Sequence, residues 1–369
     1  MSVIIFIIIL LVLVIVHECG HFFTAKKFGI RVDEFGFGFP PKLFGKKFGE
    51  TEYTVNLLPL GGFVKIFGEN PDEEGSDGPD RARSFVHRPK WQQALVLIAG
   101  VLSNFLLAWL LFSIGFLSGL PASVGTLGEK YPLGDVHTVI VSVAPDSPAE
   151  KAGLESGDKI FNIQNKDWSP SGNSPDTIKG VIAESKGEEV EIGYIRGKDE
   201  FIGSNVQFVK LIPATNDTGK LAIGISMDQI GTVRLGPISA LSEGFRLTLS
   251  VTKGTFVGLY NLVKDSVRGE GSLDSVTGPV GMVGIVDDAY KFGIVYLLSF
   301  AALISINLAI INLLPFPALD GGRLFFLLIE KIKGSPINSK IANNANMIGF
   351  ALLLLLMLVV TFHDIVKLI

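Results

Sequence analysis

The chain has 369 residues, 48% of them hydrophobic, and a formal net charge of −4. Its length allows about two to three domains. The acidic balance and the lack of a basic cluster argue against a nucleic-acid partner. The single cysteine, Cys19, excludes an intrachain disulfide. Long uninterrupted apolar runs place the chain among membrane proteins.

The first predicted element is a membrane helix over residues 2–24. It lacks a basic start and its apolar run is long for a signal peptide, so we expect it to be retained. His17 and His21 lie near its end in an H-E-x-x-H pattern, which on a helix puts two imidazoles on one face where both can bind zinc. Glu18 can act as a general base. Placing an ionisable side chain near the bilayer centre costs about 2.5–3.5 kcal/mol or more. Packing alone does not require such residues here, so we expect them to have a functional role. Cys19, between the two histidines, is a conceivable metal ligand, but on a helix it points away from the histidine face, so we expect a small apolar filler.

The next segment alternates apolar residues with Gly and Pro over 34–43 and 53–67, which predicts a β-hairpin. It is either a small cytosolic hairpin with an aromatic core or one that returns to the membrane. Residues 69–83 are rich in Asp, Glu, Gly and Pro and are typical of a mobile linker. A second span follows at 94–118. Its Asn104 either makes an interhelical hydrogen bond or serves the site.

Residues 122–228 are more polar and predict an α+β domain. A strand at 139–143, a short helix at 149–152 and a turn at 157–158 carry Ser-Pro-Ala, Ala-Gly-Leu and Gly-Asp-x-Ile patterns that resemble one PDZ domain. PDZ grooves bind peptide C-termini by strand addition. The resemblance implies a groove formed by Leu221, Ile223, Gly224 and Ile225. Alternatively, the domain only blocks access by its size. Residues 237–268 then predict an amphipathic helix along the outer membrane surface.

The third span, 294–314, runs into Asn312-Leu-Leu-Pro-Phe-Pro-Ala-Leu-Asp320-Gly-Gly, and a fourth covers 346–363. Catalytic zinc usually has three protein ligands, and Asp320 can be the third. The alternative is an ordinary Asp-Gly-Gly turn. Lys and Arg are concentrated in loops 25–93 and 315–345, so the positive-inside rule places these loops in the cytoplasm. The N-terminus, residues 119–293 and the C-terminus are then expected outside. Asp320 and the two histidines then lie at the same depth.

The H-E-x-x-H helix and the later Asn312-to-Gly321 run together resemble the site-2 protease family of intramembrane zinc metalloproteases, over nearly the whole chain. The resemblance implies a polytopic α-helical membrane protein of about four spans, with a membrane-associated cytoplasmic β-hairpin and one extracytoplasmic PDZ-like α+β domain. The implied divisions are 1–120, 121–228, 229–293 and 294–369. Some bacterial family members have two PDZ domains in tandem, whereas this sequence has one such pattern.

By the same resemblance we expect a multi-pass protein of the bacterial inner membrane that holds Zn²⁺ and hydrolyses peptide bonds of single-span membrane proteins near the cytoplasmic face. Anti-sigma factors and remnant signal peptides are the implied substrates. The implied substrate contacts are Asn312, Asn307, Gly61, Gly62, Phe63 and Val64. The main alternative is a non-catalytic, membrane-anchored PDZ receptor for exposed C-termini, and another is a zinc transporter. The receptor would need none of the polar residues of the motifs, and the transporter would need ligands at several depths.

Overall fold

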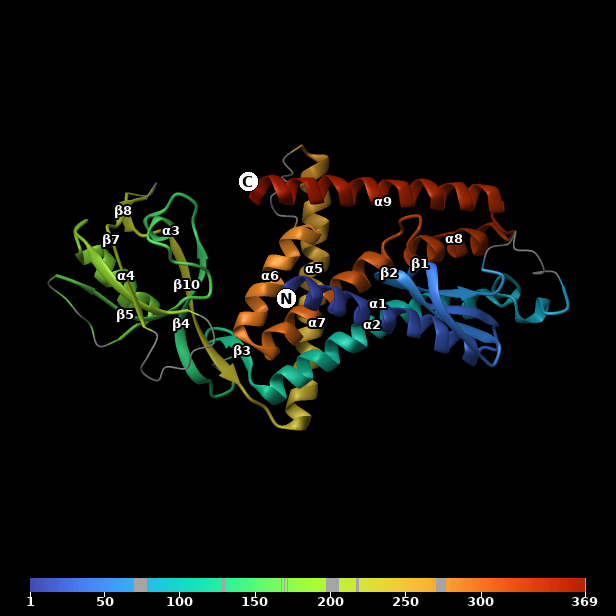
Figure 1. The fold of residues 1–369 in the computed structure, drawn as a ribbon, viewed down its shortest axis with the longest axis horizontal. Coiled ribbons are helices and arrows are strands. Elements are labelled where there is room, and N and C mark those ends of the chain that lie inside the picture. Colours follow the sequence, from blue (N-terminus) through green and yellow to red (C-terminus); the bar gives the residue numbers. More distant parts are fainter. Residues whose placement is uncertain are drawn as a thin grey trace. The chain divides into compact units, whose positions relative to one another are not determined.

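The computed structural model describes residues 1–69, 78–127, 130–166, 168, 170, 172–196, 206–216, 219–269 and 277–368. The chain forms two compact units (Figure 1). The membrane unit comprises Met1–Ile114, Ala240–Tyr290 and Leu297–Ile369. The sheet unit comprises Gly115–Ser239 and Lys291–Tyr296.

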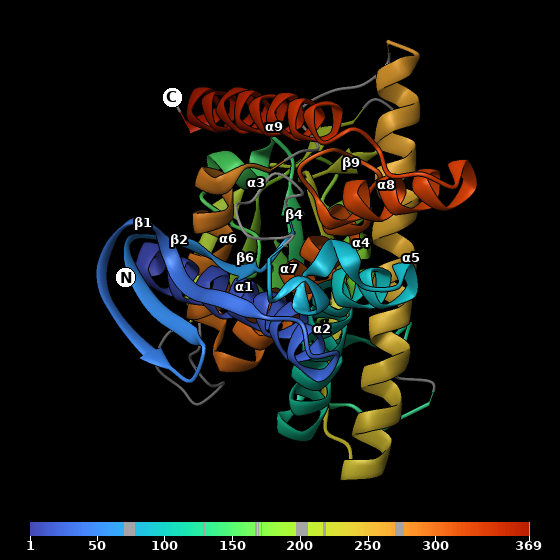
Figure 2. The same cartoon turned by 90° about the vertical axis from the view of Figure 1, so that its right-hand side faces the viewer.

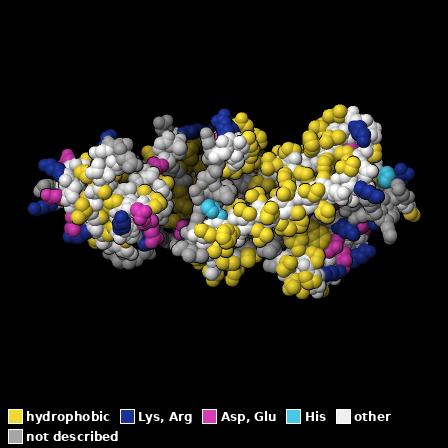
Figure 3. Space-filling model, turned by 90° about the horizontal axis from the view of Figure 1, so that it is seen from above, with side chains coloured by type: hydrophobic (Ala, Val, Ile, Leu, Met, Phe, Trp, Pro, Cys, Tyr) yellow, Lys and Arg dark blue, Asp and Glu magenta, His cyan; other side chains and the backbone are white. Residues whose placement is uncertain are grey.

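Among the described residues, four helices are long and apolar enough to cross a membrane, which confirms helices at the four predicted spans. They are α1 (Ser2–Lys27), α2 (Lys90–Ser118), α7 (Ile294–Leu313) and α9 (Ser339–Leu368). Large apolar side chains are exposed along them; on α9, Leu355, Leu358 and Phe362 are 57%, 63% and 70% exposed. Figure 3 shows such hydrophobic side chains gathered on the visible face of the membrane unit. This surface suits contact with lipid rather than with water.

In the described part of the membrane unit, three further helices accompany the spans: α5 (Pro237–Val267), α6 (Pro279–Phe292) and α8 (Asp320–Lys333). In both ribbon views α5 runs across the directions of α1 and α9 (Figures 1 and 2). It packs on α2, where Trp109 donates its indole N–H to the carbonyl of Leu241 at 2.8 Å. The ring of Phe245 contacts Phe105 and Trp109 edge-on. The helix predicted at 237–268 is therefore present and uses part of its apolar face to pack against a span.

The hairpin predicted after the first span is also present, as β1 (Val32–Phe48) and β2 (Thr51–Ile66). Phe37 pairs with both Val55 and Gly62, so the first part of β1 lies between two parts of β2. The hairpin shares a hydrophobic core with α1 and α2, formed by Phe22, Ala25, Ile30, Val32, Phe35, Ile66, Phe85, Val96 and Leu97. This core fixes the hairpin against the helix that carries the histidines.

Part of the segment predicted as a linker is tied to the hairpin, whereas residues 70–77 lie outside the described residues. Asp80 accepts a hydrogen bond from Arg31 at 2.6 Å, and Arg83 pairs with Glu50. Glu50 also pairs with Lys26 at 2.6 Å. The hydrogen bond from Lys26, with that from Arg83, holds the pKa of Glu50 below its usual range. Short 3₁₀ turns at Arg81–Arg83 and Phe85–His87 then lead into α2.

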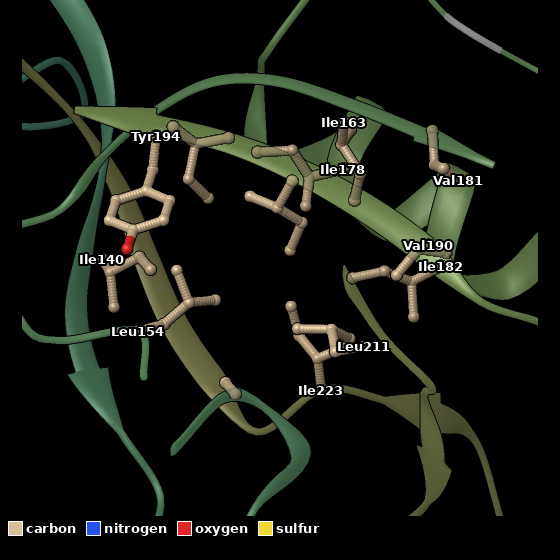
Figure 4. Close-up of a cluster of buried hydrophobic side chains, with 13 residues drawn as sticks. Ile140, Leu154, Ile163, Ile178, Val181, Ile182, Val190, Tyr194, Leu211 and Ile223 are labelled. Atoms are coloured by element: carbon tan, nitrogen blue, oxygen red, sulfur yellow. The ribbon is translucent and has the colours of Figure 1, made fainter. Parts of the chain in front are cut away.

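The sheet unit is built on a six-stranded antiparallel sheet in the order β3-β10-β4-β5-β6-β7. Its strands are β3 (Leu120–Ser123), β4 (Gly134–Val143), β5 (Lys159–Asn165), β6 (Val190–Ile195), β7 (Gln207–Leu211) and β10 (Ile225–Val233), with a small ladder of β8 (Ala214–Thr215) and β9 (Leu221–Ala222). Helices α3 (Pro148–Lys151) and α4 (Pro175–Glu184) complete it. A core of hydrophobic side chains, most of them aliphatic and most of them from the sheet and α4, holds the unit together (Figure 4).

The local elements predicted from the PDZ-like pattern are found in the sheet unit. Ser147 caps α3 by accepting the N–H of Glu150 at 3.2 Å, and Gly153 ends this turn at φ 82°. Asp158, whose side chain is 1% exposed, accepts two hydrogen bonds from Arg196, both at 2.8 Å. Those hydrogen bonds raise the pKa of Arg196. The Gly-Asp turn is therefore held by a buried carboxylate.

The predicted groove residues lie next to α4, which contacts β9 and β10. The carbonyl of Ile223 accepts the N–H of Ala149 at 2.9 Å, and the carbonyl of Gly224 accepts that of Ala144 at 2.8 Å. Ile223 is 2% exposed and belongs to the core of the unit. Leu221 and Ile225 are half-buried. These two side chains, and not Ile223, are therefore the ones that a bound peptide could reach.

Candidate metal centre

The two histidines sit on one buried face of α1. An unbroken apolar run makes this helix, and a spacing of four residues stacks His17 over His21. The two residues are 6% and 7% exposed. Burial of two imidazoles without a charge or metal partner would be costly, so their surroundings decide what they do.

Asp320, from the far end of the chain, completes a triangle with them. Its Oδ2 lies 3.0 Å from Nε2 of His17 and 3.3 Å from Nε2 of His21, and the two Nε2 atoms are 3.1 Å apart. Tetrahedral zinc with bonds of about 2.0–2.1 Å separates its ligands by about 3.3 Å. The three atoms thus have the spacing and the donor types of a catalytic zinc site. Among the described residues, these three form the group of His, Cys, Asp and Glu side chains able to hold a metal, and Cys19 is outside it.

A turn between α7 and α8 delivers Asp320. Helix α7 ends at Leu313, before the Pro-Phe-Pro run, and Ala318 adopts a left-handed φ of 75°. Its N–H is held at 3.1 Å by the side-chain oxygen of Asn346 on α9. A Cβ on Gly321 would lie 2.2 Å from the carbonyl oxygen of Leu314. Glycine is therefore required for α8 to start this close to the turn.

Two groups on α2 fix the orientation of the imidazoles. Nδ1 of His21 lies 2.8 Å from the carbonyl oxygen of Val96, and Nδ1 of His17 lies 3.3 Å from the amide nitrogen of Asn104. The backbone carbonyl of Asn104 accepts a hydrogen bond from the hydroxyl of Ser305 on α7 at 2.8 Å, which holds Asn104 in place. These contacts leave both Nε2 atoms for a metal, as outer-shell partners of zinc ligands do.

The side-chain oxygen of Asn104 is buried without a partner, and a metal explains it. When the Nε2 atom of His17 binds a metal, its Nδ1 carries the proton. If the Asn104 amide is turned over, its Oδ1 lies opposite that proton and accepts a hydrogen bond from Nδ1–H of His17. The orphaned oxygen thus fits a neutral, metal-binding His17.

Gly100 on α2 supplies the space for the cluster, and no motif in the sequence points to this role. A Cβ there would lie 2.3 Å from Nε2 of His21 and 2.9 Å from Cε1 of His17. Any larger residue would occupy the position of the imidazoles. The closeness of α1 and α2 also depends on Gly20, whose Cβ would lie 2.3 Å from the carbonyl oxygen of Ala99.

The cluster opens into a cavity of about 610 Å³. Glu18 lines it beside the histidines and accepts a hydrogen bond from the backbone N–H of Val64 on the hairpin. The other lining residues come from all parts of the membrane unit: Val14, Phe39, Phe63, Ile66, Glu69, Leu97, Leu308, Asn312, Ala318, Leu319, Arg323, Asn346 and Phe350. A carboxylate, a metal-type ligand set and a strand edge therefore face one space.

The remaining predicted contacts differ in position. Asn312 and Phe63 line the cavity, and the Cβ of an alanine at Gly62 would come within 3.7 Å of Cγ of Glu18. Gly61 is buried against the ring of Phe39. Asn307 does not line the cavity, and its side-chain oxygen accepts the hydroxyl of Thr255 at 3.3 Å.

A polytopic helical protein with a His-His-Asp cluster and an adjacent glutamate has the features of a membrane-embedded metalloprotease. The profile of peptidase family M50 matches residues 5–356, and the chain belongs to this family of site-2 zinc metalloproteases. It is therefore a zinc-dependent metalloendopeptidase and a multi-pass membrane protein.

Named relatives agree with the family. The chain is 38% identical to a putative zinc metalloprotease of Clostridium perfringens over 96% of this chain and 95% of the relative. It is 32% identical to the regulator of sigma-W protease RasP of Bacillus subtilis, over 100% and 99% of the two chains. RasP of Bacillus licheniformis is also 32% identical, over 100% and 99%.

Proposed function

We propose that this chain hydrolyses peptide bonds of single-span membrane proteins near the cytoplasmic membrane face, with His17, His21 and Asp320 holding the zinc and Glu18 as general base. The observation that carries the proposal is the triangle of ligand atoms, 3.0–3.3 Å apart, with Glu18 in the same cavity. The buried oxygen of Asn104 and the space left at Gly100 support the same assignment.

Zinc, when bound, supplies Lewis-acid polarisation of the scissile carbonyl and lowers the pKa of water toward ~7. Glu18 takes the proton of the attacking water and returns it to the leaving nitrogen. The N–H of Val64 holds the Glu18 carboxylate toward the cavity. Val96 and Asn104 keep the imidazoles from turning.

The substrate must be extended at this point, because a helix hides its peptide bonds. The hairpin segment of Gly61, Gly62, Phe63 and Val64 runs beside Glu18 and can pair with an extended chain by strand addition. Asn312 in the cavity can bond to a freed backbone group, which has no water partner in a dry site. The position of Asn307 against α5 favours a packing role for that residue.

The distribution of Lys and Arg favours a cytoplasmic hairpin and an extracytoplasmic sheet unit, in the inner membrane of a bacterium. Anti-sigma factors and remnant signal peptides are the substrate kinds that we propose, and a relative named regulator of sigma-W protease supports the first. In the sheet unit, Leu221 and Ile225 beside α4 suit a PDZ-like site for peptide C-termini, with size exclusion as a compatible role. A PDZ receptor without catalysis would leave the buried cluster unexplained.

Two substitutions in the purified full chain test the proposal. Glu18→Gln should retain one zinc per chain and lose cleavage of a tagged single-span substrate, because only the base is removed. Asp320→Asn should lower zinc content, because a neutral amide is a weaker ligand than a carboxylate. Cleavage by Glu18→Gln at the normal rate would exclude Glu18 as the base. Unchanged zinc affinity in Asp320→Asn would exclude Asp320 as a ligand.

A further inference from the structure

Arg323 has a position that the hydrolytic step does not use. It follows Asp320 by three residues on α8, so both side chains project from one face of the helix. Its guanidinium lines the metal cavity and is the one Lys or Arg side chain among the residues that line it. It forms an ion pair with Glu69 and interacts electrostatically with Glu18.

This ion pair stands in a wall between two cavities. A second cavity of about 490 Å³ lies beyond it in the membrane unit. Glu69, Leu97, Arg323 and Asn346 line both spaces. If the guanidinium of Arg323 moves away from Glu69, it therefore still borders a cavity and is not exposed to lipid.

Peptide hydrolysis makes an anion at this place. The oxygen of water bonds to the carbonyl carbon and the C–N bond breaks. The N-terminal fragment then ends in a carboxylate, and the C-terminal fragment begins with an amine. The cavity already contains Glu18, Glu69 and Asp320, so a further carboxylate needs a cation beside the metal. A guanidinium fork matches a carboxylate in shape and charge.

We propose that Arg323 releases Glu69 and binds the new carboxylate of the N-terminal product in its place. This inference rests on the proposed proteolytic function. The exchange replaces one carboxylate by another, so the guanidinium stays paired throughout. Its place in the wall gives the product end a route from the metal toward the second cavity.

The test is equilibrium binding to the zinc-loaded full chain in detergent, by fluorescence anisotropy. The probes are two labelled peptides with the sequence of an N-terminal cleavage product, one ending in a carboxylate and one in an amide. The measured quantity is the ratio of their affinities. Zinc contributes to this ratio in every variant, so comparison between variants isolates Arg323.

Arg323→Gln should lower the carboxylate-to-amide ratio about 10-fold, because a charge-assisted hydrogen bond is lost. Arg323→Lys should keep part of the preference. Glu69→Gln should raise the ratio several-fold, because it removes the competitor for the guanidinium. Lys210→Gln is the matched control: it breaks the exposed Lys210–Glu189 ion pair of the sheet unit, which lines neither cavity, and should leave the ratio unchanged.

Opposite responses of Glu69→Gln and Arg323→Gln separate product binding from a structural ion pair. A structural pair predicts that both variants lower the ratio alike, and this result would overturn the inference. A ratio in Arg323→Gln equal to that of the wild type would also overturn it. Failure of the wild-type chain to cleave any single-span substrate would instead reject the proposed function.

Discussion

Gly100→Ala adds one methyl group at the metal centre and tests the packing of α2 on α1. The new Cβ would lie 2.3 Å from Nε2 and 2.6 Å from Cε1 of His21. Carbon and nitrogen need more than about 3 Å, so the imidazole or the helix must move by close to 1 Å. Metal sites tolerate about 0.2 Å in their ligand distances. We therefore expect zinc affinity to fall at least 10-fold, the lower end of the range for changes in the groups that hold metal ligands in place.

The assay is zinc competition with a chelator of known affinity, on the purified full chain in detergent. Gly254→Ala on α5 is the matched control, because a Cβ there meets nothing within 4 Å. Both changes replace glycine by the better helix former, so propensity alone predicts no loss of folding from either. Zinc affinity in Gly100→Ala within a factor of two of the control would refute the reasoning.

Two other predictions concern groups that hold their neighbours in place. Asn104→Leu should lower zinc affinity about 10- to 100-fold, because His17 loses the group that orients it. Asn104→Asp should retain most of the affinity, because a carboxylate still accepts the His17 proton. Equal zinc affinities of the two variants in chelator competition would reject the orienting role of Asn104. Asp158→Asn should destabilise the sheet unit by about 1–3 kcal/mol, because Arg196 loses its buried charged partner. The loss is limited because the Arg196 side chain is partly exposed to solvent. Hydrogen exchange of the full chain should show faster exchange in the sheet unit alone, with Glu189→Gln in an exposed ion pair as the unaffected control.

The apolar helices and the shared face of the two histidines could be predicted from the sequence because their signals are local. An apolar run of ~20 residues defines a span, and H-E-x-x-H defines a helix face. The partner of the histidines could be found from depth, since the positive-inside rule placed Asp320 beside them. The hairpin and the helix over 237–268 followed from the same kind of periodicity.

Features that depend on which elements touch could not be predicted. Gly100, Val96 and Glu69 have ordinary sequence surroundings, and their roles follow from the packing of α2 and the hairpin on α1. Asn307 and Asn312 are five residues apart, which on a helix turns them by about 140° from one another. Asn312 therefore faces the cavity, and Asn307 faces α5. Ile223 is likewise drawn into the core of the sheet unit.

The most direct test of the account is zinc-edge anomalous diffraction from crystals of the full chain. We expect one anomalous peak within about 2.0–2.2 Å of Nε2 of His17, Nε2 of His21 and a carboxylate oxygen of Asp320. The peak should be lost in crystals of Asp320→Asn grown at the same zinc concentration. A zinc peak elsewhere in the chain, or one bound by the histidines with Asp320 turned away, would contradict the assignment.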